Sequence, residues 1–186
     1  MLLQISGTLH RHAKGWLVFI LYLLDAAFML FILPLGTALM KFDSGGPGPL
    51  DPLLFYTPAR VDQTLAAYGE FGRVFYRNME LTVDLIYPII YTLFFSLLIS
   101  WLFRRGFDPR SSIQRWNVLP FGTWLFDLLE NLGIVVMLTV FPAVPAALAW
   151  LTAGFTFIKW LFAGAMLALV VIGLAAAARN RFAIQA

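Results

Sequence analysis

The sequence predicts an all-α membrane protein, a four-helix transmembrane bundle with an extra outer helix continuous or nearly continuous with the second span. Composition is the first reason, because 61% of the 186 residues are hydrophobic and only 12% are charged. Soluble domains contain about 25% charged residues. The second reason is that the apolar residues fall into four stretches, and each has the length of about 20 residues that crosses a bilayer. We therefore interpret residues 1–186 as a single transmembrane domain.

Each predicted span is a long run of apolar residues. The spans cover about residues 15–36, 81–103, 118–141 and 146–178. The first has an apolar run too long for a cleaved signal peptide, and no small-residue cleavage pattern follows it, so we expect a retained anchor. The fourth is longer than a bilayer core of about 30 Å requires, so we expect it to tilt or to extend beyond the core.

The connection between the first two spans, residues 37–80, is predicted to contain a loop and then a helix. Its first part, KFDSGGPGPLDP, is rich in Gly and Pro and has no periodicity, which indicates a loop. Thr57 and Pro58 then form the pattern of an N-cap followed by proline in the first turn of a helix. No further proline occurs before the second span, so the helix can run into that span, with a kink at Gly69 or Gly72.

Basic residues near the ends of the spans predict the orientation. Two precede the first span, four lie between the second and third, and two follow the fourth. They are Arg11, Lys14, Arg104, Arg105, Arg110, Arg115, Arg179 and Arg181. Because cytoplasmic loops carry an excess of Lys and Arg, both termini are predicted to face the cytoplasm, and residues 37–80 to face outward. The expected location is the cytoplasmic (inner) membrane.

A polar stripe follows the outer helix into the second span. Its members are Glu70, Arg73, Arg77, Glu80, Asp84, Tyr87 and Tyr91. Their spacing alternates between three and four residues, which places them on one helical face. One interpretation is a solvated face with local ion pairs from Glu70 to Arg73 and from Arg77 to Glu80. The other is the wall of a polar cleft that opens outward, in which Arg73, Arg77 and Asp84 would take a headgroup.

Ionisable residues also occur within the other predicted spans, where water cannot solvate them. Asp25 lies in the first span and Lys159 in the fourth. Asp127 and Glu130 lie in the third, within the stretch DLLEN. Unpartnered polar groups in hydrocarbon cost several kcal/mol each, so these side chains should face the bundle interior. At a rise of about 1.5 Å per residue they fall in one inner-to-central layer, whereas Asp84 lies apart, about one turn below the outer surface.

The charges of this layer do not balance. Three carboxyls accompany one amine, so full ionisation gives −2, which is one positive charge minus three negative charges. An uncompensated charge in the middle of a bilayer costs at least ~2.5–3.5 kcal/mol. We therefore expect some of the carboxyls to be neutral, or a cation or basic ligand to balance them.

Two interpretations of the layer remain open. In the structural one, Lys159 pairs with Asp127 or Glu130 and fixes the register of the helices. In the functional one, the excess carboxyls line a cavity for a ligand or for protons. The predicted ligand-binding residues are then Asp25, Tyr87, Tyr91, Asp127, Glu130, Asn131 and Lys159.

Our preferred hypothesis is binding, with movement or sensing, of a small amphipathic molecule such as a lipid or an isoprenoid. The alternatives are proton or cation translocation through the same carboxyl layer, a membrane enzyme with Asp127 and Glu130 as acid and base, and a purely structural subunit. Binding is favoured over catalysis because no nucleophile or metal-ligand set accompanies the acids. We expect no cofactor, no metal and no nucleic acid. The expected partners are membrane lipids and, through small residues of the fourth span, another copy of the chain.

Three stretches resemble those of a group of small four-span prokaryotic membrane proteins that carry Asp-Leu-x-Glu-Asn in the third span. They are AYGEFGRVFYRNMELTVDLIYPIIYTLFF, LPFGTWLFDLLENLGI and the Lys-Trp pair of the last span, and they cover roughly residues 55–165. This resemblance implies the four-span fold and no activity. The layout of four spans with acidic interior residues is also similar to that of the emopamil-binding and sigma-2 sterol-site proteins, although the connecting loops differ. That similarity implies a precedent for a lipid-like ligand.

Overall fold

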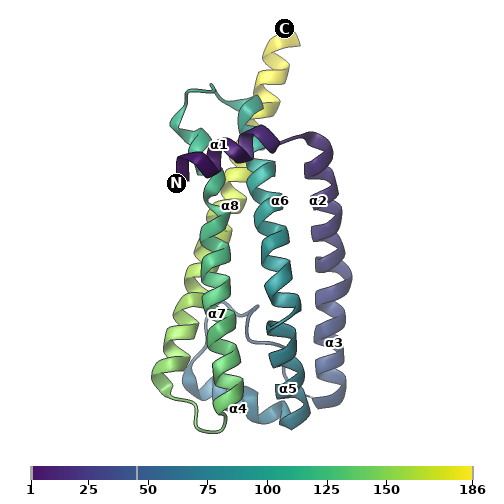
Figure 1. The fold of residues 1–186 in the computed structure, drawn as a ribbon, viewed down its shortest axis with the longest axis vertical. Helices are drawn as coiled ribbons and strands as arrows, with labels where there is room; N and C mark the ends of the chain where they lie inside the picture. Colours follow the sequence, from purple (N-terminus) through teal and green to yellow (C-terminus); the bar gives the residue numbers. More distant parts are fainter. Residues whose placement is uncertain (1, 45, 186) are drawn as a thin grey trace. The chain divides into compact units, whose positions relative to one another are not determined.

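The computed structural model describes residues 2–44 and 46–185, and this part of the chain is all-α (Figure 1). It contains no strand, and four of its helical stretches are long and apolar enough to cross a membrane. These stretches are Gly15–Lys41, Gly69–Gly106, Ser112–Val140 and Ala146–Phe182. The predicted fold class, an all-α membrane protein with four spanning helices and an extra helix, is therefore confirmed.

The extra helix is α4 (Pro58–Ala67), and it begins where the sequence predicts. The Thr57 hydroxyl accepts a hydrogen bond from the Arg60 amide at 3.3 Å, which satisfies one of the free amides of the first turn. Pro58 occupies the first turn, where it removes no helical hydrogen bond. The local sequence therefore specifies this helix start.

The predicted helix from Pro58 into the second span is broken twice. Gly69 has a φ of +64°, a left-handed conformation that favours glycine, and it separates α4 from α5 (Gly69–Glu80). A turn at residues 81–82 then precedes α6 (Val83–Gly106). The kink predicted at Gly69 or Gly72 is thus at Gly69, and the long helix consists of three pieces.

The other spans are also composite or extended. The first candidate span contains α2 (Gly15–Ala27), a π-helical stretch (Phe28–Ile32) and the beginning of α3 (Leu33–Ser44). The third contains α7 (Pro120–Val140), and the fourth lies within α8 (Ala146–Gln185). α8 is 40 residues long, which confirms that it exceeds the length of about 20 residues that a bilayer core requires.

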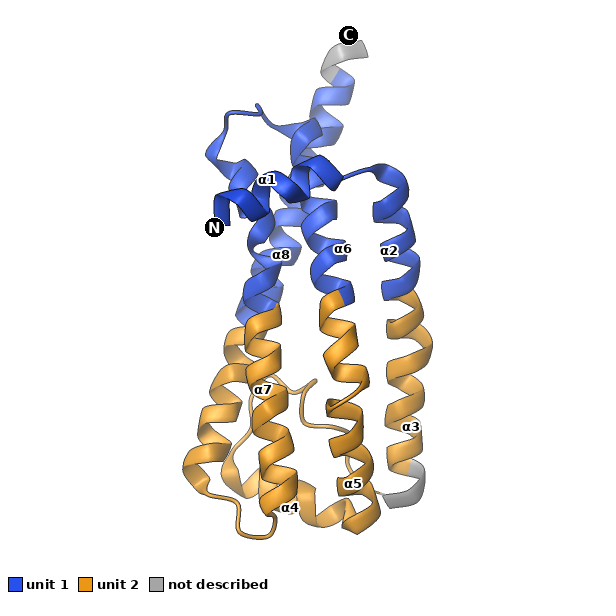
Figure 2. Ribbon diagram, in the orientation of Figure 1, with its two compact units in different colours: residues 1–25, 90–123, 161–186 blue, residues 26–89, 124–160 orange. Residues whose placement is uncertain are grey.

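The chain divides into two compact units (Figure 2). Unit 1 comprises residues 1–25, 90–123 and 161–186. Unit 2 comprises residues 26–89 and 124–160. All four candidate spans contribute residues to both units, so each unit is a packed group of helices.

Unit 1 contains α1 (Leu2–His12) and the short 3-10 helix η2 (Ser112–Val118). Asn117 is fully buried, and its side-chain amide donates to the Ser100 hydroxyl at 2.8 Å and to the Ser6 carbonyl at 3.2 Å. These two bonds connect three segments that are far apart in the sequence, so they fix how α1 and η2 pack on α6 within this unit.

Unit 2 has an apolar core in which the loop before α4 takes part. Leu50 is completely buried and Tyr56 is 3% exposed, and both belong to one cluster with Val61 and Leu65 of α4 and Ile134 of α7. The sequence predicts a loop here without indicating this burial. A buried loop has to find partners for its backbone amides and carbonyls, because no water reaches them. Those partners form one wall of the candidate site.

Candidate functional site

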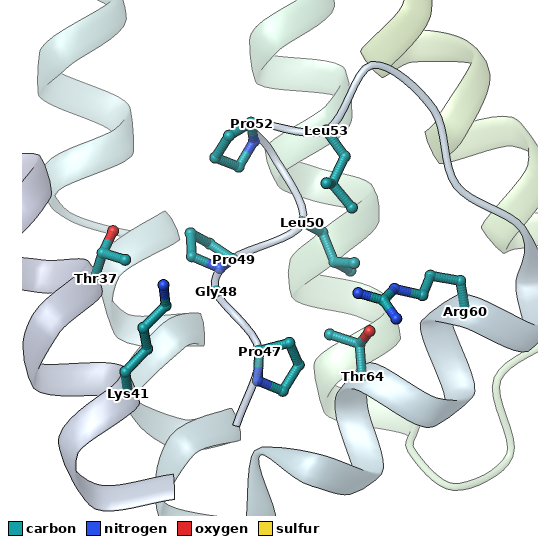
Figure 3. Close-up of a pocket in the computed structure, with 10 residues that line it drawn as sticks. All are labelled: Thr37, Lys41, Pro47, Gly48, Pro49, Leu50, Pro52, Leu53, Arg60 and Thr64. Carbon is teal, nitrogen blue, oxygen red and sulfur yellow. The ribbon is translucent and has the colours of Figure 1, made fainter. Parts of the chain in front are cut away.

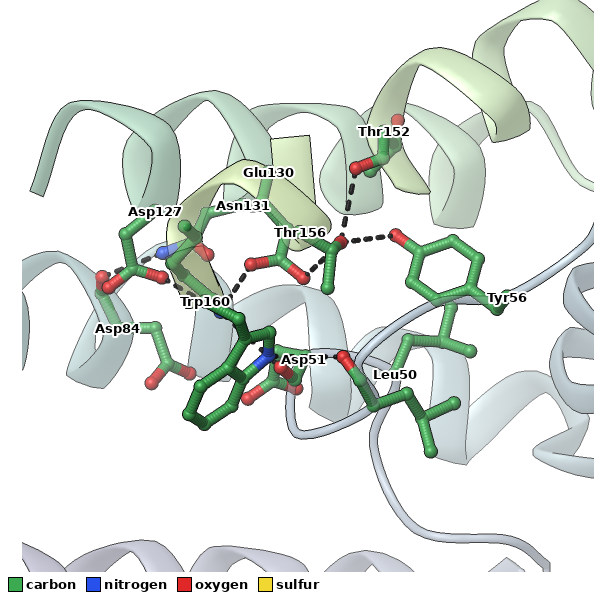
Figure 4. Close-up of polar contacts among 12 residues, drawn as sticks. Leu50, Asp51, Tyr56, Asp84, Asp127, Glu130, Asn131, Thr152, Thr156 and Trp160 are labelled. Atoms are coloured by element: carbon green, nitrogen blue, oxygen red, sulfur yellow. Dashed lines mark hydrogen bonds and ion pairs between the residues drawn. The ribbon is translucent and has the colours of Figure 1, made fainter. Parts of the chain in front are cut away.

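An ion-paired contact joins α7 to α8 within unit 2 (Figure 4). The Lys159 ammonium is 3.2 Å from Asp127 Oδ1, and it also forms an ion pair with Glu130 Oε2. Asp127 and Glu130 are three residues apart, so they share one face of α7. Glu130 is completely buried and Lys159 is 8% exposed. The sequence-based expectation that Lys159 meets these two acids is confirmed.

Thr156 extends this contact on the same face of α8. Its hydroxyl donates to Glu130 Oε1 at 2.6 Å, so side chains of α8 bind both oxygens of this carboxylate. The Tyr56 hydroxyl lies 3.3 Å from Thr156 Oγ1. Burial raises the pKa of the Tyr56 phenol above its ordinary value, which keeps the phenol protonated and able to donate. Tyr56 therefore connects the loop to the ion pairs through Thr156.

The loop before α4 supplies the third wall of the site through its backbone. The Asp51 carbonyl accepts a hydrogen bond from the Lys159 ammonium at 3.3 Å, and the Leu53 carbonyl accepts one from the Trp160 indole at 3.1 Å. The Asp51 carboxylate accepts from the Tyr76 hydroxyl at 2.7 Å. Non-helical backbone that is buried in protein needs partners for its polar groups, and these bonds supply some of them.

Two further acidic residues of the polar stripe, Glu80 and Asp84, lie next to these ion pairs. The Asn131 side-chain amide donates to the Asp84 carbonyl at 2.8 Å, which brings the first turn of α6 against α7. Glu80 is 1% exposed, and neither of its oxygens has a hydrogen-bond partner among the described residues. Glu80 lies close enough to Asp51, Asp84 and Glu130 for their charges to interact. We call the five acidic residues Asp51, Glu80, Asp84, Asp127 and Glu130 the acidic cluster; Asp127 and Glu130 are the two that form ion pairs with Lys159.

The positions of Asp84 and Glu80 differ from two expectations. The sequence predicts that Asp84 lies apart from the intramembrane layer, whereas in the structure its backbone carbonyl accepts a hydrogen bond from Asn131, next to Glu130 in the sequence. Glu80 was one half of an expected ion pair with Arg77 on a solvated face. It is instead buried, and no ion pair joins these two residues in the described part of the chain.

The remaining stripe residues do not converge on the cluster. Glu70 is exposed, and Arg77 is partly exposed. The Arg73 guanidinium donates to the Leu65 carbonyl at 3.0 Å and stacks 4.6 Å from the centre of the Phe141 ring, so it connects α5 to α4 and to the turn after α7 within unit 2. No ion pair joins Glu70 to Arg73 in residues 2–44 and 46–185.

Three predicted ligand-binding residues lie outside the contacts described above. Asp25 and Tyr91 belong to unit 1, whereas the ion pairs described above lie in unit 2. Tyr87 belongs to unit 2 and stacks on Phe28, with ring centres 5.5 Å apart. A ligand-binding role for these three residues remains a prediction.

Sequence reasoning missed Asp51 and Tyr56 as members of the site, whereas it predicts that Thr156 faces inward with Lys159 and completes hydrogen bonds there. Thr156 carried a signal, since it lies three residues before Lys159 on one helical face. Asp51 and Tyr56 lie in a loop without periodicity, so their spacing does not predict where their side chains point. The only indication was a run of apolar residues at 53–56 in a segment that should otherwise be solvated.

Comparisons with known proteins add no family to this description. No family model matches the chain, and neither a curated protein nor a solved structure matches it significantly. Within the described residues, no three His, Asp or Glu side chains are arranged to hold a metal ion. The fold defines the class as an integral membrane protein with four candidate spanning helices.

Proposed function

We propose that this membrane protein binds a small amphipathic molecule with a cationic head at the acidic cluster of unit 2. The observation that carries the proposal is the charge of the cluster. Two of its five carboxyls form ion pairs with its one amine, and full ionisation of the cluster would give −4, which is one positive charge minus five negative charges. Buried charges are costly unless they are paired. A ligand that brings an ammonium or several hydrogen-bond donors would relieve this excess.

The partly exposed edge of the cluster is the proposed binding position. The Asp127 side chain is 13% exposed and Asp84 is partly exposed, whereas Glu130 is completely buried. Figure 4 shows Asp84, Asp127 and Trp160 on one side of the cluster, with Tyr56 and Thr152 on the other. Trp160 is 38% exposed, and its ring, which has the Lys159 ammonium 5.6 Å from its centre, offers an aromatic face to a cation on this side of the cluster.

The alkyl part of such a ligand would lie along the apolar surface of α8. Phe157 precedes Trp160 by three residues on this helix and is 49% exposed. Side chains of this kind normally face lipid in a spanning helix, so a ligand tail could replace a lipid chain without loss. The proposal therefore needs a pocket only for the polar head.

Binding of dodecylamine to the purified protein, compared with dodecanol of equal chain length, tests this proposal. Native mass spectrometry from maltoside micelles would measure the bound fraction. We expect the amine to bind at least about ten-fold more tightly than the alcohol, since a hydrogen-bonded charge contributes ~1.5–3 kcal/mol. Asp127→Asn should remove that preference, whereas the exposed Asp62→Asn on α4 should keep it. Equal binding of amine and alcohol by the wild type would contradict the proposal.

Proton translocation is a second candidate, favoured by Glu80. This carboxyl is 1% exposed and lies close to the carboxyls of Asp51, Asp84 and Glu130, so it extends the series of acids within the cluster. The Tyr76–Asp51 hydrogen bond and the Asp51–Lys159 contact lie beside it. Proton flux in liposomes that is lost in both Glu80→Gln and Glu130→Gln would support this candidate. Flux that persists in both variants would exclude it.

A further inference from the structure

A separate pocket of unit 2 shares no residue with the acidic cluster. It has a volume of about 260 Å³ and lies between α3, α4 and the loop before α4 (Figure 3). Both of its charged residues are basic, Lys41 from α3 and Arg60 from α4. The full lining is Thr37, Lys41, Pro47, Gly48, Pro49, Leu50, Pro52, Leu53, Arg60 and Thr64. Unlike the acidic cluster, this pocket is therefore positively charged.

Thr64 provides an independent sign that the pocket takes a ligand. Thr64 is 2% exposed and lines the pocket, and its hydroxyl has no hydrogen-bond partner among the described residues. Buried hydroxyls are nearly always hydrogen-bonded, so a missing partner calls for an explanation. An acceptor held in the pocket would supply that partner.

The two basic side chains are available for an external anion. Lys41 and Arg60 are exposed, and neither forms an ion pair with a carboxylate in the described part of the chain. Figure 3 shows Lys41 and Arg60 on either side of the loop segment that carries Gly48. A Cβ on Gly48 would lie 3.3 Å from Lys41 Cε, so glycine lets the lysine side chain lie against the loop.

The loop that forms the pocket is held in place before any ligand binds. Three prolines restrict its backbone, at positions 47, 49 and 52. The Tyr68 hydroxyl donates to the Gly48 carbonyl at 2.8 Å, and the Leu50 amide donates to the Tyr76 hydroxyl at 3.0 Å. Burial raises the pKa of Tyr68, so its phenol remains a donor. A preorganised pocket loses less entropy when it binds a ligand.

We propose that this pocket binds a phosphate-type anion, either the phosphate of a lipid headgroup or free phosphate. A guanidinium donates in a fork that matches phosphate oxygens, an ammonium adds a point charge, and the threonine hydroxyls donate single hydrogen bonds. The volume is just below the ~300–1,000 Å³ of pockets for drug-sized ligands, so it fits a headgroup rather than a whole lipid. This site goes beyond the proposed function, because it uses other residues and the opposite charge.

Two probes distinguish the two sources of phosphate. Inorganic phosphate and a short-chain phosphatidic acid below its micellar concentration would each be titrated by calorimetry into the protein in maltoside micelles. Arg60→Gln and Lys41→Gln remove one charge each from the pocket. Arg110→Gln is the matched control, since Arg110 is exposed in the loop between α6 and η2. Thr64→Val keeps the shape of the buried side chain and removes its hydroxyl.

We expect at least one probe to bind the wild type. Arg60→Gln and Lys41→Gln should each weaken binding about ten-fold or more, and Thr64→Val several-fold, because charged hydrogen bonds contribute more than neutral ones. Arg110→Gln should bind like the wild type. Binding of both probes would indicate recognition of phosphate itself, and binding of the lipid alone would indicate a headgroup. Failure of both probes, or equal binding by Arg60→Gln and the wild type, would overturn the proposal.

Discussion

Both carboxylate oxygens of Glu130 are bound by side chains of α8, one by the Lys159 ammonium and the other by the Thr156 hydroxyl. Glu130 is completely buried, so no water can replace either contact. Interhelical hydrogen bonds in membrane proteins contribute about 0.6 kcal/mol on average and up to about 1.7 kcal/mol. The two contacts together therefore fix the register of α7 against α8 within unit 2.

Thr156→Val tests the hydrogen bond from the Thr156 hydroxyl to Glu130. The variant leaves Glu130 Oε1 without its donor and the Tyr56 hydroxyl without its neighbour, so the free energy of unfolding should fall by about 1–2 kcal/mol. Thr139→Val is the matched control, because the Thr139 hydroxyl is exposed and donates to the Val135 carbonyl of its own helix at 2.7 Å. That change should stay within about 0.5 kcal/mol. Unfolding by SDS in mixed micelles measures both, and equal effects would contradict the account.

At the scale of elements, α7 and α8 meet closely one turn beyond the ion pairs. A Cβ on Gly133 would overlap the side chain of Thr152, so only glycine allows this approach. The Thr152 hydroxyl donates to the Leu148 carbonyl of its own helix at 2.9 Å, so it needs no acceptor from α7. Close packing of this kind is a main source of helix association in membranes.

Gly133→Ala should therefore destabilise unit 2, although alanine is the better helix former. Forcing an extra methyl group into a packed interface costs about 1–3 kcal/mol. Gly154→Ala on α8 is the control, because nothing lies within 4 Å of a Cβ at that position. Its expected effect is neutral or stabilising by up to about 1 kcal/mol. A Gly133→Ala variant as stable as Gly154→Ala would show that the two helices are farther apart than described.

The loop before α4 is an element of the core rather than a surface connection. Tyr76→Phe removes the acceptor of the Leu50 amide and the donor to Asp51, so the loop should open more readily. Hydrogen exchange at the Leu50 amide should accelerate by up to about ten-fold, which corresponds to roughly 1.4 kcal/mol. The Val61 amide, which donates to the Thr57 carbonyl at 3.0 Å, should exchange as in the wild type. Unchanged exchange at Leu50 would mean that the tyrosine does not hold the loop.

These elements differ in how far the sequence predicts them. Hydropathy and length predict the four spans, and the Thr57–Pro58 pattern predicts the start of α4, because both signals are local. Helical spacing also brings Asp127 and Glu130 to one face, and charge then selects Lys159 as their partner. The loop is different, because its local sequence does not indicate which helices of unit 2 it packs against. Asp51 and Tyr56 could not be assigned to the site for this reason.

At the scale of the whole molecule, the basic residues predict that both termini are cytoplasmic and that residues 37–80 face outward. The chain contains no cysteine, so single introduced cysteines report topology directly. Ser112 and Gln63 are exposed positions in a predicted inner and a predicted outer segment. A membrane-impermeant maleimide added to intact cells should label Gln63→Cys and leave Ser112→Cys unlabelled until the cells are opened. The reverse pattern would invert the predicted orientation.

The proposed ligand, the second candidate and the fixed register all depend on a real contact between Lys159 and Glu130. A double-mutant cycle with Lys159→Met and Glu130→Gln measures it most directly. Lys159→Met leaves the buried Glu130 carboxylate and the partly exposed Asp127 carboxylate without their cation, so it should cost about 3–5 kcal/mol of unfolding free energy. The double variant should be more stable than the sum of the single effects predicts, by about 1 kcal/mol or more. Effects that add within about 0.5 kcal/mol would show that the two residues do not interact, and the acidic cluster would not exist as described.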